Sequence, residues 1–173
     1  RHGTALERVG ETTVAVFDKT GTLTLGMPRV KRVTTTGSLS ENELLRLAGA
    51  VEEKSGHLLA RVLVDEATAR GIRTPAASNV VESPGRGVEG DVEERHLIVG
   101  AASFVRERFP ALDLNLGELL SGTASDGVQL TACVVIDGEL AGAVEYADMM
   151  RPGAATLFAD LATLGIRNIT LLS

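Results

Sequence analysis

A short apolar run that ends in an aspartate constrains the fold of this chain more than any other feature of its sequence. The run covers Thr13 to Phe17 and stops at Asp18. Apolar residues at consecutive positions are typical of a strand that is buried on both faces of a parallel sheet. In such sheets, ligands bind beyond the carboxyl ends of the strands. We therefore expect an α/β unit with Asp18 at its functional edge.

The hydrophobic periodicity beyond that strand predicts an α+β module inserted into the α/β unit. Ser40 and Glu43 have the spacing of a capping box, which opens a helix. Asp137-Gly138 fits a type I′ turn and predicts a hairpin of residues 128–136 and 140–146. The other expected elements are strands at 30–36, around 80–81, from 88 to 99 and at 168–172, and helices at 58–69, 102–109 and 152–164.

The last of these strands could return to the sheet that the first strand begins, which predicts a split α/β domain. Its two parts are residues 1–28 and 146–173, and the inserted α+β domain with an antiparallel sheet covers residues 29–145. The chain begins with Arg1-His2-Gly3 rather than Met and ends on an apolar run. We therefore expect it to be a piece of a longer protein.

Composition excludes several classes of function. The net charge is −6 and the sequence has no run rich in Lys or Arg, so nucleic acid is not an expected partner. Aromatic residues make up only 3% of the chain, so the core must be aliphatic. Cys133 lies in an apolar run and is expected to be a buried reduced thiol. No stretch approaches the roughly 20 apolar residues of a membrane-spanning helix, so the chain as given is expected to be soluble.

The residues after Asp18 suit phosphoryl chemistry. A carboxylate at a strand end can act as a nucleophile, and the backbone N–H groups of a turn that contains Gly21 can cradle phosphoryl oxygens. The carboxylate and a phosphate repel each other, so Mg²⁺ must bridge them. Lys19 adds positive charge nearby.

The run Asp18-Lys19-Thr20-Gly21-Thr22-Leu23-Thr24 resembles the phosphorylation signature of P-type ATPases, whose phosphorylation domain has the haloacid dehalogenase-like, Rossmann-like fold. The resemblance implies that Asp18 accepts the phosphoryl group of ATP and that Asp18 and the Thr20 carbonyl hold Mg²⁺. It also places Thr20 and Gly21 at the phosphate. Phosphatase relatives have a general acid/base Asp where this chain has Thr20, which does not titrate near neutral pH, so a long-lived aspartyl phosphate is favoured.

The inserted segment resembles the ATP-binding module of the heavy-metal (CPx-type) branch, which uses a Glu, a Ser-Glu-His-Pro run and a Gly-x-Gly turn. The corresponding runs here are Ser55-Gly56-His57-Leu58 and Gly85-Arg86-Gly87. Gly56 and Leu58 depart from the family pattern, and Ala101 stands where the family often has Asn. A neutral imidazole can stack on adenine, and glycines allow close approach of the backbone to a ligand. The residues that the resemblance assigns to the nucleotide are Glu52, His57, Gly85 and Gly87.

Asp148-Met149-Met150-Arg151-Pro152 resembles the hinge motif Asp-x-x-Arg-Pro, which returns the chain to the phosphorylation domain. Asp148 and Arg151 either pair across the two linkers, or Arg151 reaches the nucleotide phosphates. A helix N-terminus with Pro152 in its first turn is compatible with both. By the same resemblance, Ser173 is the hydroxyl residue of the next phosphate-binding motif.

These features lead to the hypothesis of an ATP-binding and phosphorylation portion of a cation-transporting P-type ATPase at the cytoplasmic face of a membrane. The resemblance implies ATP and Mg²⁺ as ligands, the transmembrane and actuator domains of the same full-length chain as partners, and a transported cation bound outside this segment. Two alternatives stay open: a haloacid dehalogenase-like phosphatase with a large cap, and a nucleotide-binding module without catalysis. We expect the chain alone to bind ATP weakly without accumulating phosphoenzyme.

Overall fold

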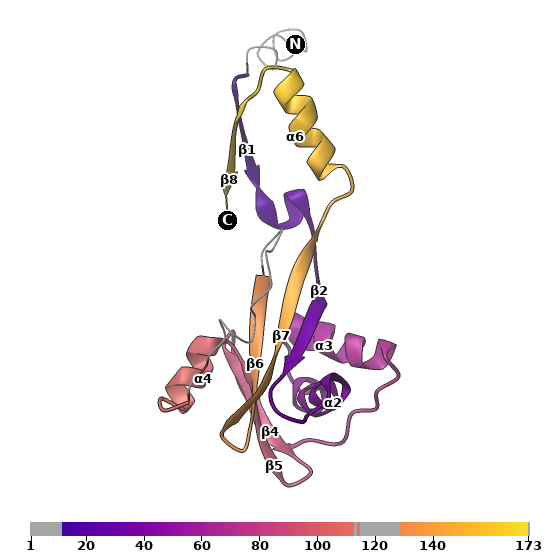
Figure 1. Ribbon diagram of the computed structural model, residues 1–173, viewed down its shortest axis with the longest axis vertical. Coiled ribbons are helices and arrows are strands. Elements are labelled where there is room, and N and C mark those ends of the chain that lie inside the picture. The colour runs from indigo at the N-terminus through magenta and orange to yellow at the C-terminus, as the bar shows by residue number, and fades with distance from the viewer. Residues whose placement is uncertain (1–11, 113, 115–128, 173) are drawn as a thin grey trace. The chain divides into compact units, whose positions relative to one another are not determined.

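The computed structural model describes residues 12–112, 114 and 129–172 of the chain (Figure 1). Two compact units divide it: a central unit, Pro28–Ala147, and a terminal unit formed by the residues up to Met27 and from Asp148 onward. In the described part of the chain, no helix is both long enough and apolar enough to cross a membrane.

The described residues of the terminal unit form a parallel pair of strands, a π-helical turn and an α-helix. Strand β1 (Val14–Asp18) pairs with β8 (Asn168–Leu172), from Val14 opposite Asn168 to Asp18 opposite Leu172. The predicted return of the last strand to the first is therefore confirmed. A single π-helical turn, η1 (Lys19–Leu23), follows β1. Helix α6 (Ala154–Thr163) begins two residues later than predicted, because Gly153 caps it with a left-handed φ of 88°.

The prediction that the first strand is buried on both faces is wrong for the described residues. Val14 and Val16 are exposed, whereas Ala15 and Phe17 are half-buried. The Phe17 ring meets the Phe158 ring of α6 edge-on, with centroids 5.9 Å apart. The strand alternates because α6 covers one face of this two-stranded sheet, and the consecutive apolar sequence did not reveal that asymmetry.

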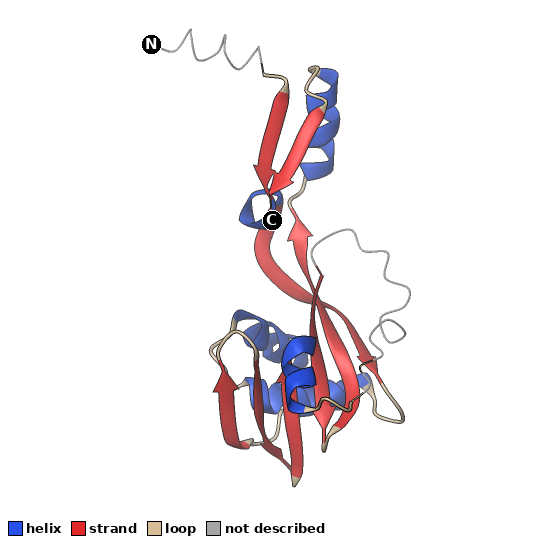
Figure 2. Ribbon diagram, turned by 90° about the vertical axis from the view of Figure 1, so that its left-hand side faces the viewer, coloured by secondary structure: helices blue, strands red, loops and turns tan. Residues whose placement is uncertain are grey.

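A six-stranded sheet, in the order β2-β7-β6-β5-β4-β3, forms the framework of the central unit (Figure 2). The pairs from β3 to β7 are antiparallel, as predicted for the inserted module. The strands are β2 (Thr24–Thr35), β3 (Ser78–Ser83), β4 (Gly87–Val92), β5 (Arg95–Gly100), β6 (Gln129–Ile136) and β7 (Glu139–Met150), and the helices are α2 (Glu41–Glu52), α3 (Leu58–Ala69) and α4 (Ala102–Arg108).

Local signals explain most of these boundaries. Ser40 caps α2 by accepting a hydrogen bond from the Glu43 N–H at 3.2 Å, and α3 has the predicted bounds. Asp137 and Gly138 both have positive φ, which confirms the type I′ hairpin between β6 and β7. The segment from 88 to 99 is itself a hairpin, β4–β5, with positive φ at Glu93 and Glu94. A Glu-Glu turn lacks the Asn or Gly that normally marks this geometry, so the sequence did not indicate it.

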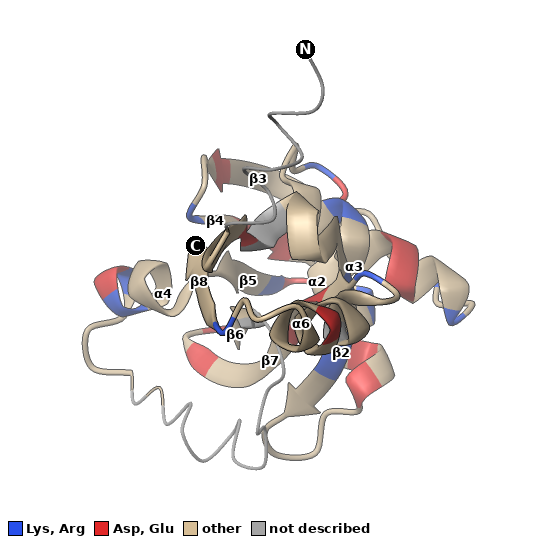
Figure 3. Ribbon diagram, turned by 90° about the horizontal axis from the view of Figure 1, so that it is seen from above, with Lys and Arg blue, Asp and Glu red and all other residues tan. Residues whose placement is uncertain are grey.

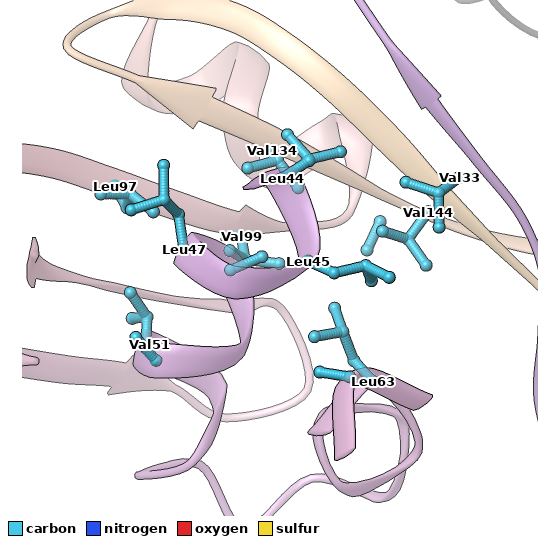
Figure 4. Packing of buried hydrophobic residues seen from close by; sticks show 14 of the residues in the cluster. Val33, Leu44, Leu45, Leu47, Val51, Leu63, Leu97, Val99, Val134 and Val144 are labelled. Atoms are coloured by element: carbon cyan, nitrogen blue, oxygen red, sulfur yellow. The ribbon is translucent and has the colours of Figure 1, made fainter. Parts of the chain in front are cut away.

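The core of the central unit lies on both faces of the sheet. On one face, the apolar side of α2 packs against alternate strand residues, and Leu63 of α3 joins them (Figure 4). On the other face, Phe104 and Val105 of α4 pack against Ile98, Cys133 and Val135. Cys133 is fully buried, as predicted, and burial raises the pKa of its thiol to about 11.

The surface of this unit carries mixed charge. Acidic and basic segments lie next to each other on α4 and near α2 and α3 (Figure 3). Arg46 pairs with Glu43 at 2.7 Å and with Glu93 at 2.6 Å, and Arg70 pairs with Glu66 at 2.7 Å.

Candidate functional site

Asp18 is the last residue of β1, at the carboxyl end of the parallel pair, and it is exposed. The turn that follows depends on Gly21, whose φ of +79° is unfavourable for residues with a Cβ. The Gly21 N–H donates to the Thr24 hydroxyl at 3.1 Å, which closes the turn on itself. The structure therefore places Asp18 where a strand end and a tight glycine turn meet.

The hinge residues bond to this same turn. The Thr24 hydroxyl donates to one Asp148 oxygen at 2.5 Å, and the Met27 N–H donates to the other at 3.1 Å. The Arg151 guanidinium donates to the Gly21 carbonyl at 2.8 Å, and its backbone N–H donates to the Leu23 carbonyl at 2.8 Å. The side chains of Asp148 and Arg151 thus both hold the segment that follows Asp18. Each hydrogen bond has one charged partner, which makes it stronger than a neutral one.

A separate pocket of about 270 Å³ lies in the central unit. Its lining includes all four residues that the sequence assigned to the nucleotide, and Ala101 lies there too. Apolar side chains of β5 and β6 form part of the wall, among them Val99, Leu130 and Ala132. Concave, mostly apolar sites with a few polar groups are typical binding sites for small molecules. The residues assigned to the nucleotide that line it are Glu52, His57, Gly85 and Gly87.

His57 is held in place by the turn before α3. Its Nδ1 accepts a hydrogen bond from the Leu59 N–H at 3.2 Å, so the neutral ring carries its proton on Nε2. Glu82 of β3 orders the turn by accepting from the Ser55 hydroxyl at 2.9 Å and from the Gly56 N–H at 3.3 Å. Sequence reasoning missed Glu82, because only strand pairing brings it to this turn.

The two positions of the Gly-x-Gly run require glycine for different structural reasons. Gly85 has a φ of +71°, which the turn between β3 and β4 requires. At Gly87, an added Cβ would lie 2.6 Å from the Val99 carbonyl oxygen and 2.6 Å from the Phe104 ring. Gly87 therefore permits close packing of β4 against β5 and α4, and this packing forms one wall of the pocket.

Glu52 is the most buried carboxylate of the lining, with 8% of its surface exposed. Burial, followed by the charge of Glu82, raises its pKa to about 7. Tyr146 of β7 lines the same pocket and is 1% exposed. Burial, followed by the charge of Glu52, raises the pKa of its hydroxyl. No sequence signal pointed to Tyr146, because it occupies an ordinary inward position of strand β7.

The sequence from residue 12 to residue 173 matches the family described as haloacid dehalogenase-like hydrolase. The chain belongs to this family. It is 37% identical over 170 residues to a zinc/cadmium/lead-transporting P-type ATPase of Escherichia coli K12, covering 98% of this chain and 22% of that protein. It is 32% identical over 171 residues to a copper-exporting P-type ATPase of Vibrio cholerae, covering 99% of this chain and 18% of that protein.

Solved structures show the same similarity. A zinc-transporting PIB-type ATPase in the E2.Pi state superposes with a TM-score of 0.75 at 34% identity, covering 98% of this chain and 26% of the other. The N-domain of HMA8, a copper-transporting P-type ATPase, gives a TM-score of 0.58 at 27% identity, over 67% of this chain and 97% of the other.

This haloacid dehalogenase-like chain is thus homologous to the catalytic region of heavy-metal P-type ATPases, which confirms the predicted fold class and the family resemblance. It spans about a fifth of the length of the curated relatives it matches. Three predicted site positions, however, are not tested by the geometry. The side chains of Lys19 and Thr20, and the whole of Ser173, lie outside the described residues.

Proposed function

We propose that this chain is the ATP-binding and phosphorylation portion of a cation-transporting P-type ATPase of the heavy-metal type. One observation carries the proposal: Glu52, His57, Gly85 and Gly87, chosen from the sequence, line a single pocket in the unit that follows Asp18. The likeness to zinc- and copper-transporting ATPases supports the heavy-metal assignment.

The pocket suits the base and ribose of ATP. Val99, Leu130 and Ala132 offer apolar surface to an aromatic ring, and the His57 imidazole can stack on it or donate from Nε2. Glu52 supplies a carboxyl that can both donate and accept when it is protonated.

In the proposed reaction, an Asp18 carboxylate oxygen attacks the γ-phosphorus of ATP. The new O–P bond forms as the bond to the β,γ-bridging oxygen breaks, and ADP leaves with that electron pair. Backbone N–H groups of the turn that are not engaged within it, as that of Gly21 is with Thr24, stabilise the transferred oxygens, and Arg151 and Asp148 hold the turn in shape. Thr20 supplies no general base, so the phosphoenzyme persists long enough to act as an intermediate.

The donor set after β1 fits Mg²⁺. This ion takes hard oxygen ligands and keeps several waters, so the Asp18 carboxylate and the Thr20 carbonyl would suffice together with ATP phosphate. When bound, Mg²⁺ neutralises the repulsion between carboxylate and phosphate. The proposal further places transmembrane and actuator domains and the transported cation's ligands elsewhere in a full-length chain, with this region at the cytoplasmic face of a membrane.

The proposal is tested by labelling with ATP that carries radioactive phosphorus at the γ-position. In the full-length protein with Mg²⁺, we expect an acid-stable label that hydroxylamine removes, as an acyl phosphate requires, and no label in Asp18→Asn. Asp160→Asn, at an exposed position of α6, is the matched control and should label like the wild type. Labelling that persists in Asp18→Asn would exclude Asp18 as the acceptor.

A further inference from the structure

Tyr146 carries a buried hydroxyl without a partner. It is the single tyrosine of the chain, it is 1% exposed, and it lines the pocket described above. No described residue hydrogen-bonds to its hydroxyl oxygen, which is itself shielded from solvent. Buried tyrosine hydroxyls normally find a partner, and an unsatisfied one lowers the stability of the folded state. The Tyr146 hydroxyl therefore lacks the hydrogen-bond partner that a buried tyrosine normally has.

Glu52 is the polar group that lies within electrostatic reach of this hydroxyl. Its charge acts on Tyr146, and both side chains line the same pocket. No hydrogen bond from a described residue to the Glu52 carboxyl is present either, although Ser55, Gly56 and His57 nearby all have partners. Glu52 and Tyr146 are thus the two most buried polar residues of the same pocket lining, at 8% and 1% exposure, and the Tyr146 hydroxyl is buried without a described partner.

We propose that Tyr146 is a positioning residue for base recognition: its hydroxyl pairs with the Glu52 carboxyl when a 6-aminopurine nucleotide occupies the pocket. This inference rests on the proposed ATP site and adds to it the residue that fixes base selectivity. Glu52 has a flexible side chain, and its carbonyl oxygen has two lone pairs, so a carboxyl that pairs with a bound base can still accept a hydrogen bond from the Tyr146 hydroxyl. The hydrogen bond that is missing in the free protein then forms on binding and contributes to affinity.

The base that fits best depends on the Glu52 carboxyl, which is buried in the pocket and pairs with a base when it holds its proton. A neutral carboxyl presents one donor and one acceptor, which match the N1 acceptor and the 6-amino donor of adenine. Guanine presents the reverse pattern, with a hydrogen on N1 and an oxygen at position 6. A carboxyl with its proton on the other oxygen would match guanine, so the preference depends on the Tyr146 hydroxyl. By donating to one carboxyl oxygen, the hydroxyl keeps that oxygen as the acceptor and the proton on the other, which should strengthen the binding of ATP and not that of GTP.

The test uses the 173-residue chain and isothermal titration with ATP and with GTP. Tyr146→Phe should weaken ATP binding by about fivefold, the effect of one neutral hydrogen bond, and leave GTP binding unchanged. Without nucleotide, the same variant should unfold at an equal or higher temperature, because it removes an unsatisfied hydroxyl. Thr34→Val is the matched control: it deletes another buried hydroxyl without a described partner, outside the pocket lining, and should leave ATP binding unchanged.

Two results would overturn the inference. In one, Tyr146→Phe binds ATP as tightly as the wild type does. In the other, it weakens ATP and GTP equally and lowers the unfolding temperature, which would assign the hydroxyl a purely structural role. A wild-type chain that binds no ATP would instead refute the proposed function, and this inference with it.

Discussion

Replacing Glu52 with glutamine should flatten the pH dependence of the stability of the central unit. Burial in the pocket, followed by repulsion from Glu82, raises the pKa of Glu52 from 4.5 to about 7. The folded state therefore keeps this proton to a higher pH than the unfolded state does. Its contribution to stability is fully present below about pH 4.5 and is lost as the pH rises through about 7.

The size of the effect follows from that shift. At about 1.4 kcal/mol for each pH unit, the full loss is about 3 kcal/mol, most of it between about pH 5 and about pH 8. Glu52 is 8% exposed, so solvent screening reduces this free energy only slightly. Glutamine has the same shape and no charge at any of these pH values, so its stability should lack this component.

Tyrosine fluorescence provides the assay. The chain has one tyrosine and no tryptophan, and Tyr146 is buried in the central unit, so its emission in a urea titration follows that unit alone. The free energy of unfolding is compared at about pH 5 and about pH 8 for the wild type, Glu52→Gln and Glu139→Gln, an exposed control. We expect the control to lose stability like the wild type. If Glu52→Gln loses as much free energy of unfolding between about pH 5 and about pH 8 as the wild type does, the raised pKa of Glu52 is not the cause of the pH dependence.

Three further predictions concern the two sites. His57→Ala should weaken ATP binding through lost stacking, by about threefold to tenfold in titration calorimetry, and an unchanged affinity would remove His57 from the site. Gly87→Ala should lower the unfolding temperature of the central unit, since its Cβ would meet a β5 carbonyl oxygen at 2.6 Å; Gly56→Ala, with open space around it, should not. Thr24→Val breaks the bond to Asp148 and should destabilise the terminal unit by about 2 kcal/mol; unaltered hydrogen exchange in β1 would contradict this.

Local sequence signals specified the elements whose boundaries depend on neighbouring residues. Ser40, Asp137 and Gly138 each fix the geometry of a cap or turn by their own side chain or permitted φ, and all three behave as predicted. The Glu93-Glu94 turn was missed because strand pairing, rather than residue type, imposes positive φ there.

The pocket could be predicted only in part for a related reason. Glu52, His57, Gly85 and Gly87 lie in short runs that resemble a family motif, and the structure gathers them in one pocket. Glu82 and Tyr146, by contrast, reach the pocket from β3 and β7, so they become visible only when the sheet order is known. Sequence spacing alone says nothing about such residues.

The central claim, that this pocket binds ATP, is tested most directly by titrating the isotope-labelled chain with ATP and following its backbone amide resonances. We expect saturable shifts centred on Glu52, His57, Gly85 and Gly87, with smaller changes at residues outside the pocket lining. Saturating ATP that left these four amides unmoved, or that produced its largest shifts away from the pocket, would contradict ATP binding at this site.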